Sequence, residues 1–235
     1  MTQIHDSRYL REHPVPRSYL RRFSPNGTHV YVYDKATGQV ALVATSNIAQ
    51  AAVPECAVEL QLEKWEGELS DVTDTALRVA AGGAADPEVR RSMSICVAVQ
   101  LTRSRATGER PAAGGGSIPE LAADLYHFVW QIGINGTDTP LVTSDSPVVR
   151  CNDDSDQLVY PLTPAVALMM YHPRCFEGMP PGKDRARHLS LMEVERCNAL
   201  QLLGCRSQAY SRKNIFWSMR DAASAWRERV HRTGS

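Results

Sequence analysis

The sequence has no long apolar run, no excess of charge of either sign and few aromatic residues. No segment approaches the roughly 18 consecutive apolar residues that a membrane-spanning helix needs, and residues 1–10 lack the apolar centre of a signal peptide. Lys plus Arg and Asp plus Glu both number 26, so no overall field attracts nucleic acid or an anionic membrane. We therefore expect a cytoplasmic protein with no membrane partner, and nucleic acid is not indicated as a ligand.

The six cysteines form no Cys-x-x-Cys pair and show no spacing typical of a disulfide framework. Most of them lie in apolar or helical stretches, so we expect six reduced thiols, as in a cytosolic protein. The histidines form no HxH, HExxH or HxxxH pattern, and no zinc or iron triad follows from their spacing. We therefore predict no metal site and no cofactor, while the oligomeric state stays open.

The order of periodic segments predicts one α+β domain spanning residues 1–235. Alternation of polar and apolar residues predicts a β-hairpin from strands at 28–34 and 39–44. Helical spacing of apolar residues then predicts a helical block inserted between β segments at 55–133, with helices over 58–80, 86–104 and 118–133.

After Gly136 the pattern changes to short strands separated by turn residues, which is typical of a β-meander. We expect strands at 140–143, 147–151, 157–162 and 165–171, a loop at 173–188, a helix at 190–204, a strand at 207–211 and a helix at 216–230. The hairpin is predicted to join the 140–171 strands in a single mixed or antiparallel sheet. The apolar stripe of the 58–80 helix is expected to pack against that sheet.

Two segments carry unusual combinations of residues. Residues 13–23 place a histidine beside two prolines, followed by a Tyr/Leu/Phe face flanked by arginines. Far downstream, residues 143–148 read Thr-Ser-Asp-Ser-Pro-Val. Because neither combination is needed for an ordinary turn, we take both segments as candidates for a functional site.

These segments resemble the domain-of-unknown-function 4238 family, which is found widely in bacteria and in fungi. The first matches the family's His-x-Val-Pro-x-x-Tyr-Leu-x-x-Phe opening, and the second matches its Thr-Ser-Asp-x-Pro-Val motif. Residues 160–164 resemble its Pro-Leu-Ser/Thr-Pro motif, and Asn198 a late asparagine. The resemblance covers most of the chain and implies a fold group and candidate residues, but no reaction.

His13 and Asp145 are the candidate catalytic residues. Pro16 suits the first position of a short helix through Phe23, and a helix N-terminus lowers the pKa of a nearby histidine, as a general base requires. Alternatively, the His13 ring fixes the entering chain by bonding a backbone carbonyl. Asp145 either orients His13 or holds a cation, or it makes a structural turn by accepting bonds from the next backbone N–H groups.

Further polar residues of the two segments are candidates for substrate binding. Arg17 and Arg21, with Arg22, form a possible clamp for phosphate or carboxylate, or else pair with the acidic 58–80 helix. Asn198 falls on the apolar stripe of its predicted helix, so its amide needs partners. It either ties down the Ser144–Ser146 turn or contacts ligand. The predicted binding residues are Arg17, Tyr19, Arg21, Ser144, Ser146 and Asn198.

Two classes of function fit these residues. In the first, the chain is a small hydrolase or transferase that uses acid–base chemistry on a phosphate-bearing substrate such as a nucleotide or RNA, for instance as a defence effector. In the second, it is a non-catalytic ligand- or protein-binding module in which both segments are structural. A small-molecule tailoring enzyme of a biosynthetic pathway is a third option. The first class requires the two segments to meet at an open cleft, whereas the second requires them to be buried and hydrogen-bonded.

Overall fold

The strands of this chain form two sheets in the computed structural model, which describes residues 15, 17–49, 87–105, 117–151, 157–176, 185–217 and 219. The four-stranded sheet has the order β2 (Val40–Ala44), β1 (His29–Asp34), β9 (Gln208–Ser211) and β4 (Thr143–Ser144). The five-stranded sheet has the order β5 (Val149–Arg150), β6 (Gln157–Thr163), β7 (Val166–Tyr171), β3 (Val129–Asn135) and β8 (Arg185–Leu189). With helices alongside, these sheets confirm the predicted α+β fold class.

The predicted hairpin is confirmed as β1 and β2, which pair antiparallel. Gly38 takes the positive φ of 69° that the connecting turn requires, a conformation that favours glycine. The expectation of a single sheet is wrong, because the hairpin belongs to the four-stranded sheet whereas β5, β6 and β7 belong to the five-stranded sheet. β1 pairs on its other side with β9, near the end of the described chain. β4 and β5 each have only two residues, and the chain crosses from one sheet to the other between them.

The five-stranded sheet is covered on both faces, which explains its long apolar strands. On one face, Trp130, Leu168 and Met170 belong to a core shared with helix α4 (Pro87–Arg105). On the other face, Val159 and Met169 belong to a core shared with helix α6 (Leu191–Gly204). All three inner strands β6, β7 and β3 are therefore mostly buried.

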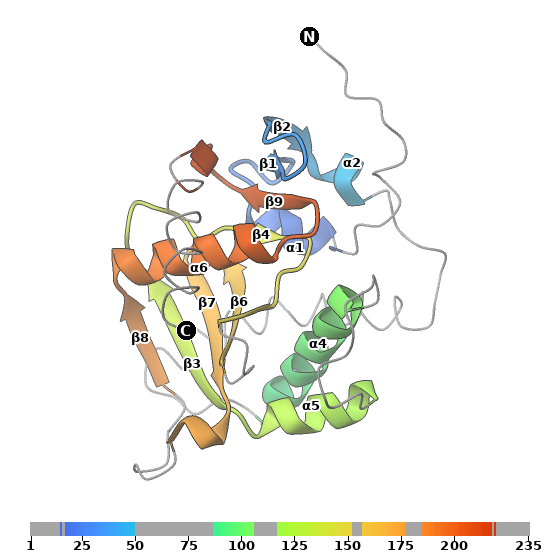
Figure 1. Cartoon of the computed structure of the whole chain (residues 1–235), viewed down its shortest axis with the longest axis vertical. Helices are drawn as coiled ribbons and strands as arrows, with labels where there is room; N and C mark the ends of the chain where they lie inside the picture. The colour runs from blue at the N-terminus through green and yellow to red at the C-terminus, as the bar shows by residue number, and fades with distance from the viewer. Residues whose placement is uncertain are drawn as a thin grey trace, which may run out of the picture.

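Helices α4 and α5 (Ile118–Tyr126) pack against each other beside the second sheet (Figure 1). The predicted 86–104 helix is confirmed as α4 from Pro87 onward. The predicted 118–133 helix is too long, because α5 ends at Tyr126 and residues 129–135 form β3. Leu121 and Leu125 do share a helical face, but Ile132 continues that spacing only by coincidence and pairs with Leu168 of β7.

The segment predicted as a loop at 173–188 contains further regular structure. A short 3-10 helix spans Pro173–Phe176, and β8 runs parallel to β3 at the edge of the sheet. β8 contains only two apolar residues, Ala186 and Leu189, so its sequence shows little of the apolar alternation that is typical of a strand. Charged side chains are common on edge strands, where they oppose pairing with another chain.

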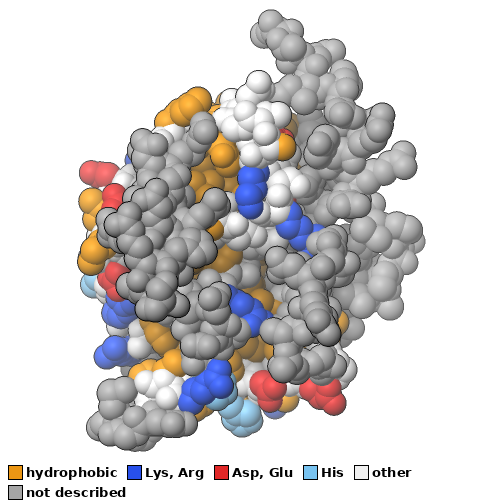
Figure 2. Space-filling view, viewed as in Figure 1, with side chains coloured by type: hydrophobic (Ala, Val, Ile, Leu, Met, Phe, Trp, Pro, Cys, Tyr) orange, Lys and Arg blue, Asp and Glu red, His pale blue; other side chains and the backbone are white. Residues whose placement is uncertain are grey.

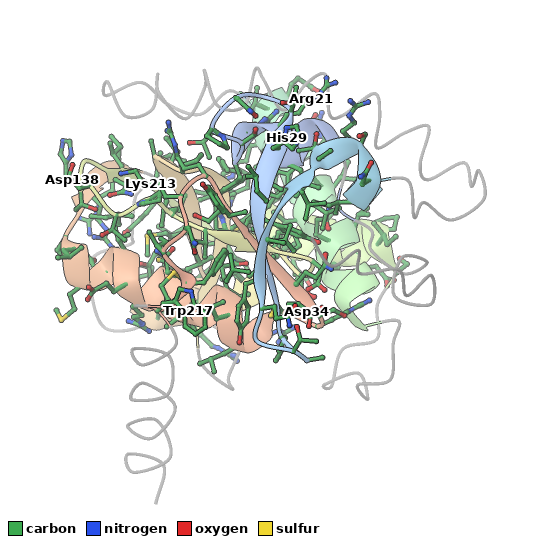
Figure 3. All side chains as sticks on the ribbon, turned by 90° about the horizontal axis from the view of Figure 1, so that it is seen from above. Arg21, His29, Asp34, Asp138, Lys213 and Trp217 are labelled. Carbon is green, nitrogen blue, oxygen red and sulfur yellow. The ribbon has the colours of Figure 1, made fainter. Side chains whose placement is uncertain are left out.

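α6 crosses the region where the two sheets meet, and it contacts β4, β5, β8 and β9 (Figure 1). Its start is confirmed: the Ser190 hydroxyl accepts from the Glu193 N–H, and the Glu193 carboxylate accepts from the Ser190 N–H at 2.9 Å. Helix α1 (Arg17–Arg22) lies on the opposite side of the four-stranded sheet, near α2 (Thr45–Ala49) (Figure 3). The strand segment before Pro147 is therefore enclosed between α6 and α1.

Several predicted features fall outside the described residues. They are His13, Cys56, the 58–80 helix and the 216–230 helix beyond residue 219. Five cysteines are described, at 96, 151, 175, 197 and 205, and each is a free thiol. Within the described ranges, no helix has the length and apolarity needed to cross a membrane.

Candidate functional site

Residues 140–147 form the centre of the candidate site, and every one of them is buried. Leu141 and Val142 are fully buried apolar residues that draw the segment into the core. Thr143 and Ser144 then pair as β4 with Tyr210 and Ala209 of β9. Burial of this polar segment requires a partner for each of its hydrogen-bonding groups, and those partners come from three separate parts of the chain.

Asp145 binds the turn that precedes β9. Its Oδ1 accepts a hydrogen bond from the backbone N–H of Arg206 at 2.8 Å. Its Oδ2 accepts from the N–H groups of Ser207 at 2.7 Å and Gln208 at 3.0 Å. The Asp145 N–H donates in turn to the Gln208 carbonyl at 3.0 Å. The carboxylate, which is 1% exposed, therefore joins two segments about sixty positions apart.

Ser144 makes the local turn that the sequence predicts, through its own hydroxyl. The Ser144 Oγ accepts a hydrogen bond from the Ser146 N–H at 3.2 Å. The same hydroxyl donates to Oε1 of Gln201 at 2.7 Å, and Nε2 of Gln201 donates to the Pro147 carbonyl at 2.8 Å. The Gln201 amide thus holds both ends of the turn from α6.

Asn198 lies one helical turn before Gln201 on the same buried face of α6. Its Oδ1 accepts from the Val142 N–H at 2.9 Å, and its Nδ2 donates to the Pro140 carbonyl at 2.9 Å. The predicted burial is confirmed, since the side chain is 0% exposed. Its partners are backbone groups of residues 140–142, which precede β4, and it is Gln201 that holds the Ser144–Ser146 turn itself. Gln201 was missed, although a second polar residue three positions along the buried face was a usable signal.

Tyr19 connects α1 to the same segment from the opposite side. Its hydroxyl donates to the Pro161 carbonyl at 2.6 Å and lies 2.6 Å from the Thr143 Oγ1. A phenol has one proton, so the Thr143 hydroxyl is the donor in the second bond. Burial raises the pKa of Tyr19 well above its usual range, against the smaller lowering effects of Thr143 and Arg22. Tyr19 is therefore a neutral link between helix and strand.

The α1 arginines differ in their surroundings. Arg17 and Arg21 are exposed, and Arg21 extends from α1 at the surface (Figure 3). Arg22 is half-buried, and its Nη1 is fully buried without a hydrogen-bond partner in the structure. The predicted acidic partner helix at 58–80 lies outside the described residues, so its pairing with these arginines stays a prediction.

The structure brings Tyr19, Ser144, Asp145 and Asn198 together around residues 140–147, with Ser146 in the same buried turn. Arg17 and Arg21 lie on the outer surface of the helix that carries Tyr19. Because His13 lies outside the described residues, its predicted pairing with Asp145 stays a prediction. Among the described residues, no group of three or more His, Cys, Asp or Glu side chains is placed to hold a metal ion.

A second polar cluster, absent from the sequence predictions, lies beside the start of α6. Arg187 of β8 donates to Gln131 Oε1 at 3.1 Å and pairs with Glu193 at 2.5 Å. Burial raises the pKa of Glu193, but hydrogen bonds from Ser190 and Arg187 outweigh that effect and leave the pKa lowered. The paired side chains are 26% and 33% exposed. The cluster fastens the edge strand to the helix.

Positive charge is dispersed on the visible surface. On the face shown in Figure 2, described Lys and Arg side chains stand apart from one another among hydrophobic side chains. This distribution agrees with the equal numbers of acidic and basic residues in the sequence. Arg21 of α1 lies on a different side of the molecule from α6, which faces the viewer in Figure 1.

Fold and site together define an α+β protein with two sheets joined through a buried polar segment. Residues 107–214 match the family model described as "Protein of unknown function (DUF4238)", which confirms the family resemblance predicted from the sequence. The matched residues include the 140–147 segment and α6, whereas α1 precedes them. No curated protein and no solved structure matched the chain.

Proposed function

We propose that this chain is a non-catalytic ligand-binding module in which residues 140–147 are the scaffold of the binding surface. The observation that carries the proposal is the Asp145 carboxylate, which is 1% exposed and accepts three backbone hydrogen bonds from residues 206–208. A group that holds two chain segments together in this way serves the fold first.

The other buried polar residues of the segment support the same role. The Ser144 hydroxyl both donates and accepts within the protein, which does not suit a nucleophile that must face a substrate. The amide of Asn198 uses its oxygen on the Val142 N–H and its nitrogen on the Pro140 carbonyl, just before β4. Both side chains are 0% exposed, so a ligand has no direct access to them.

The exposed side of α1 is the better place for a ligand. Arg17 and Arg21 reach solvent, and Tyr19 fixes the helix that carries them to Thr143 and Pro161. An arginine presents a planar set of donors that matches phosphate or carboxylate oxygens. We therefore propose a phosphate-bearing small molecule as the ligand, with the scaffold keeping α1 in place.

We also propose a cytosolic location. The five described cysteines are free, and burial raises the pKa of Cys151 to about 12 and of Cys197 to about 11. Thiols of this kind are stable in a reducing compartment and have little thiolate to react at neutral pH. Thiol titration of the denatured chain without reductant is expected to find all six.

The test makes the same Asp→Asn substitution at a buried position and at an exposed position and compares the stability of the two variants. In Asp145→Asn, the loss of the charged acceptor is expected to lower the free energy of unfolding by about 2–4 kcal/mol, because hydrogen bonds to charged groups are worth about 1.5–3 kcal/mol each. Asp138→Asn is the control, since Asp138 is exposed at the surface (Figure 3). Urea denaturation measures both.

The contrary result would favour an enzyme. If Asp145→Asn and Asp138→Asn are equally stable, the Asp145 carboxylate is not needed by the fold. The acid–base hydrolase or transferase with His13 as base, acting on a phosphate-bearing substrate, would then become the better hypothesis.

A further inference from the structure

Arg22 occupies a position that the hydrogen bonding of the fold does not explain. It ends α1, a helix with three arginines and no acidic residue. Its side chain is half-buried, and its Nη1 is buried without a hydrogen-bond partner in the structure. Nearly all buried polar atoms in proteins have a partner, and a charged donor without one is more costly than a neutral donor.

Two buried tyrosines lie within the electrostatic reach of Arg22. The positive charge of Arg22 acts on the hydroxyl groups of Tyr19 and Tyr160, opposing the rise in pKa that burial gives each phenol. Both phenols are therefore neutral, and the single proton of Tyr19 is donated to Pro161. Within the described part of the chain, no carboxylate forms an ion pair with Arg22.

Arg21 and Arg17 extend the positive charge from this point to the surface. The two lie four positions apart, so they share one face of the helix, and Arg21 directly precedes Arg22. Both are exposed. A ligand that arrives from solvent can thus contact these two guanidinium groups on the helix that also carries the half-buried Arg22.

We propose that Arg22 anchors an anion site on α1 that binds the phosphate group of a ligand, with Arg21 and Arg17 at its entrance. This inference rests on the proposed binding function and names the residue that anchors its ligand. A doubly charged phosphate suits three cations within six residues better than a singly charged carboxylate does. A phosphate oxygen supplies the acceptor that Nη1 lacks when the guanidinium turns toward the ligand.

The experiment is calorimetric titration of the full chain with inorganic phosphate at constant ionic strength, with acetate as the carboxylate comparison. Arg22→Gln removes the anchor, and Arg185→Gln is the matched control because it makes the same change at an exposed arginine of β8, in the other sheet and outside the proposed site. We expect phosphate to bind the wild type more tightly than acetate. Arg22→Gln is expected to weaken phosphate binding by about tenfold or more, whereas Arg185→Gln is expected to change it by less than about twofold.

Equal phosphate affinity in the wild type and Arg22→Gln would overturn the site, and so would the absence of phosphate binding to the wild type. If Arg22→Gln does not fold, Arg22→Lys decides: it keeps the charge but loses the planar pair of donors, so unchanged affinity contradicts the proposal and weakened affinity supports it. Failure of this site is separate from failure of the binding module. The module is judged by the stability of Asp145→Asn, whatever phosphate does.

Discussion

The two sides of the 140–147 segment differ in how completely their polar groups are paired. On the α6 side, Asn198 and Gln201 each use both ends of their amide on the segment. On the α1 side, Tyr19 is fully bonded, but Arg22 three residues later has a buried nitrogen without a partner. Complete pairing is what a scaffold needs, and an unpaired cation is what a binding site has before its ligand arrives. Our proposals accordingly assign the scaffold to the α6 side and ligand binding to the α1 side.

Asn198→Ala is expected to give the largest effect, because it breaks the α6 side of the comparison. The change leaves the Val142 N–H and the Pro140 carbonyl buried without partners. At about 1–3 kcal/mol for each of the two unsatisfied groups, the free energy of unfolding should fall by about 2–6 kcal/mol. Urea denaturation measures it, with the exposed Glu195→Ala on the same helix as control. A loss equal to that of the control would show that the amide does not stabilise the segment.

Tyr19→Phe sharpens the comparison from the other side. It removes only the hydroxyl, leaving the Pro161 carbonyl without its donor and the Thr143 hydroxyl without its acceptor. The ring contacts with Phe23 and Tyr160 are kept. We expect a loss of about 1–2 kcal/mol, smaller than for Asn198→Ala because Thr143 can rotate its hydroxyl toward another acceptor. A loss as large as that of Asn198→Ala would show that hydrogen bonds from α1 stabilise residues 140–147 as much as those from α6 do.

Alkaline pH should weaken the whole buried region. Burial raises the pKa of Tyr210 well above its usual value and that of Cys205 to about 12. A raised pKa in the folded state means that stability is full below the unfolded pKa and is lost as pH rises toward the folded pKa. The free energy of unfolding should therefore decline from about pH 8.5, where unfolded thiols begin to ionise, and more steeply above about pH 10. A flat profile between pH 8 and 11 would contradict the burial of these groups.

The Arg187–Glu193 pair should show the smallest effect. Its side chains are 26% and 33% exposed, so solvent screens much of their attraction. The lowered pKa of Glu193 contributes stability above the unfolded pKa, and that stability is lost as pH falls through the folded pKa. We expect Glu193→Gln to cost about 0.5 kcal/mol at pH 7, and less in high salt. A salt-independent loss above about 2 kcal/mol would mean that the pair acts as a buried one.

Elements defined by local signals were predictable from the sequence. The β1–β2 hairpin has alternating residues around a turn, and α6 begins with a serine whose hydroxyl and Glu193 cap its first turn. The boundary between α5 and β3 was not predictable, because Ile132 falls on the helical spacing although strand pairing places it in the sheet. β8 was missed because its charges hide its alternation. Whether these two segments form strands depends on pairing with strands that are distant in the sequence, and the local residue pattern does not show that pairing.

The candidate site was predictable in its members but not in its contacts. The sequence singled out Asp145, and it indicated that Asn198 is buried and needs hydrogen-bond partners. It could not show that Asp145 binds the N–H groups of residues 206–208, because a carboxylate has no preference in sequence distance. The sequence also could not show that Arg22, unlike Arg17 and Arg21, has a buried side-chain nitrogen. That distinction depends on which nitrogen is enclosed by the folded chain.

Amide hydrogen exchange at Ser207 and Gln208 tests the central claim most directly. If the Asp145 carboxylate is part of the scaffold, both amides exchange as slowly as those of the central strands, because they open only when the segment after β4 separates from the start of β9. In Asp145→Asn, their protection should fall by at least about tenfold more than that of amides in β7. Exchange at the rate of an open loop in the wild type would contradict the structural role of Asp145 and with it the proposed scaffold.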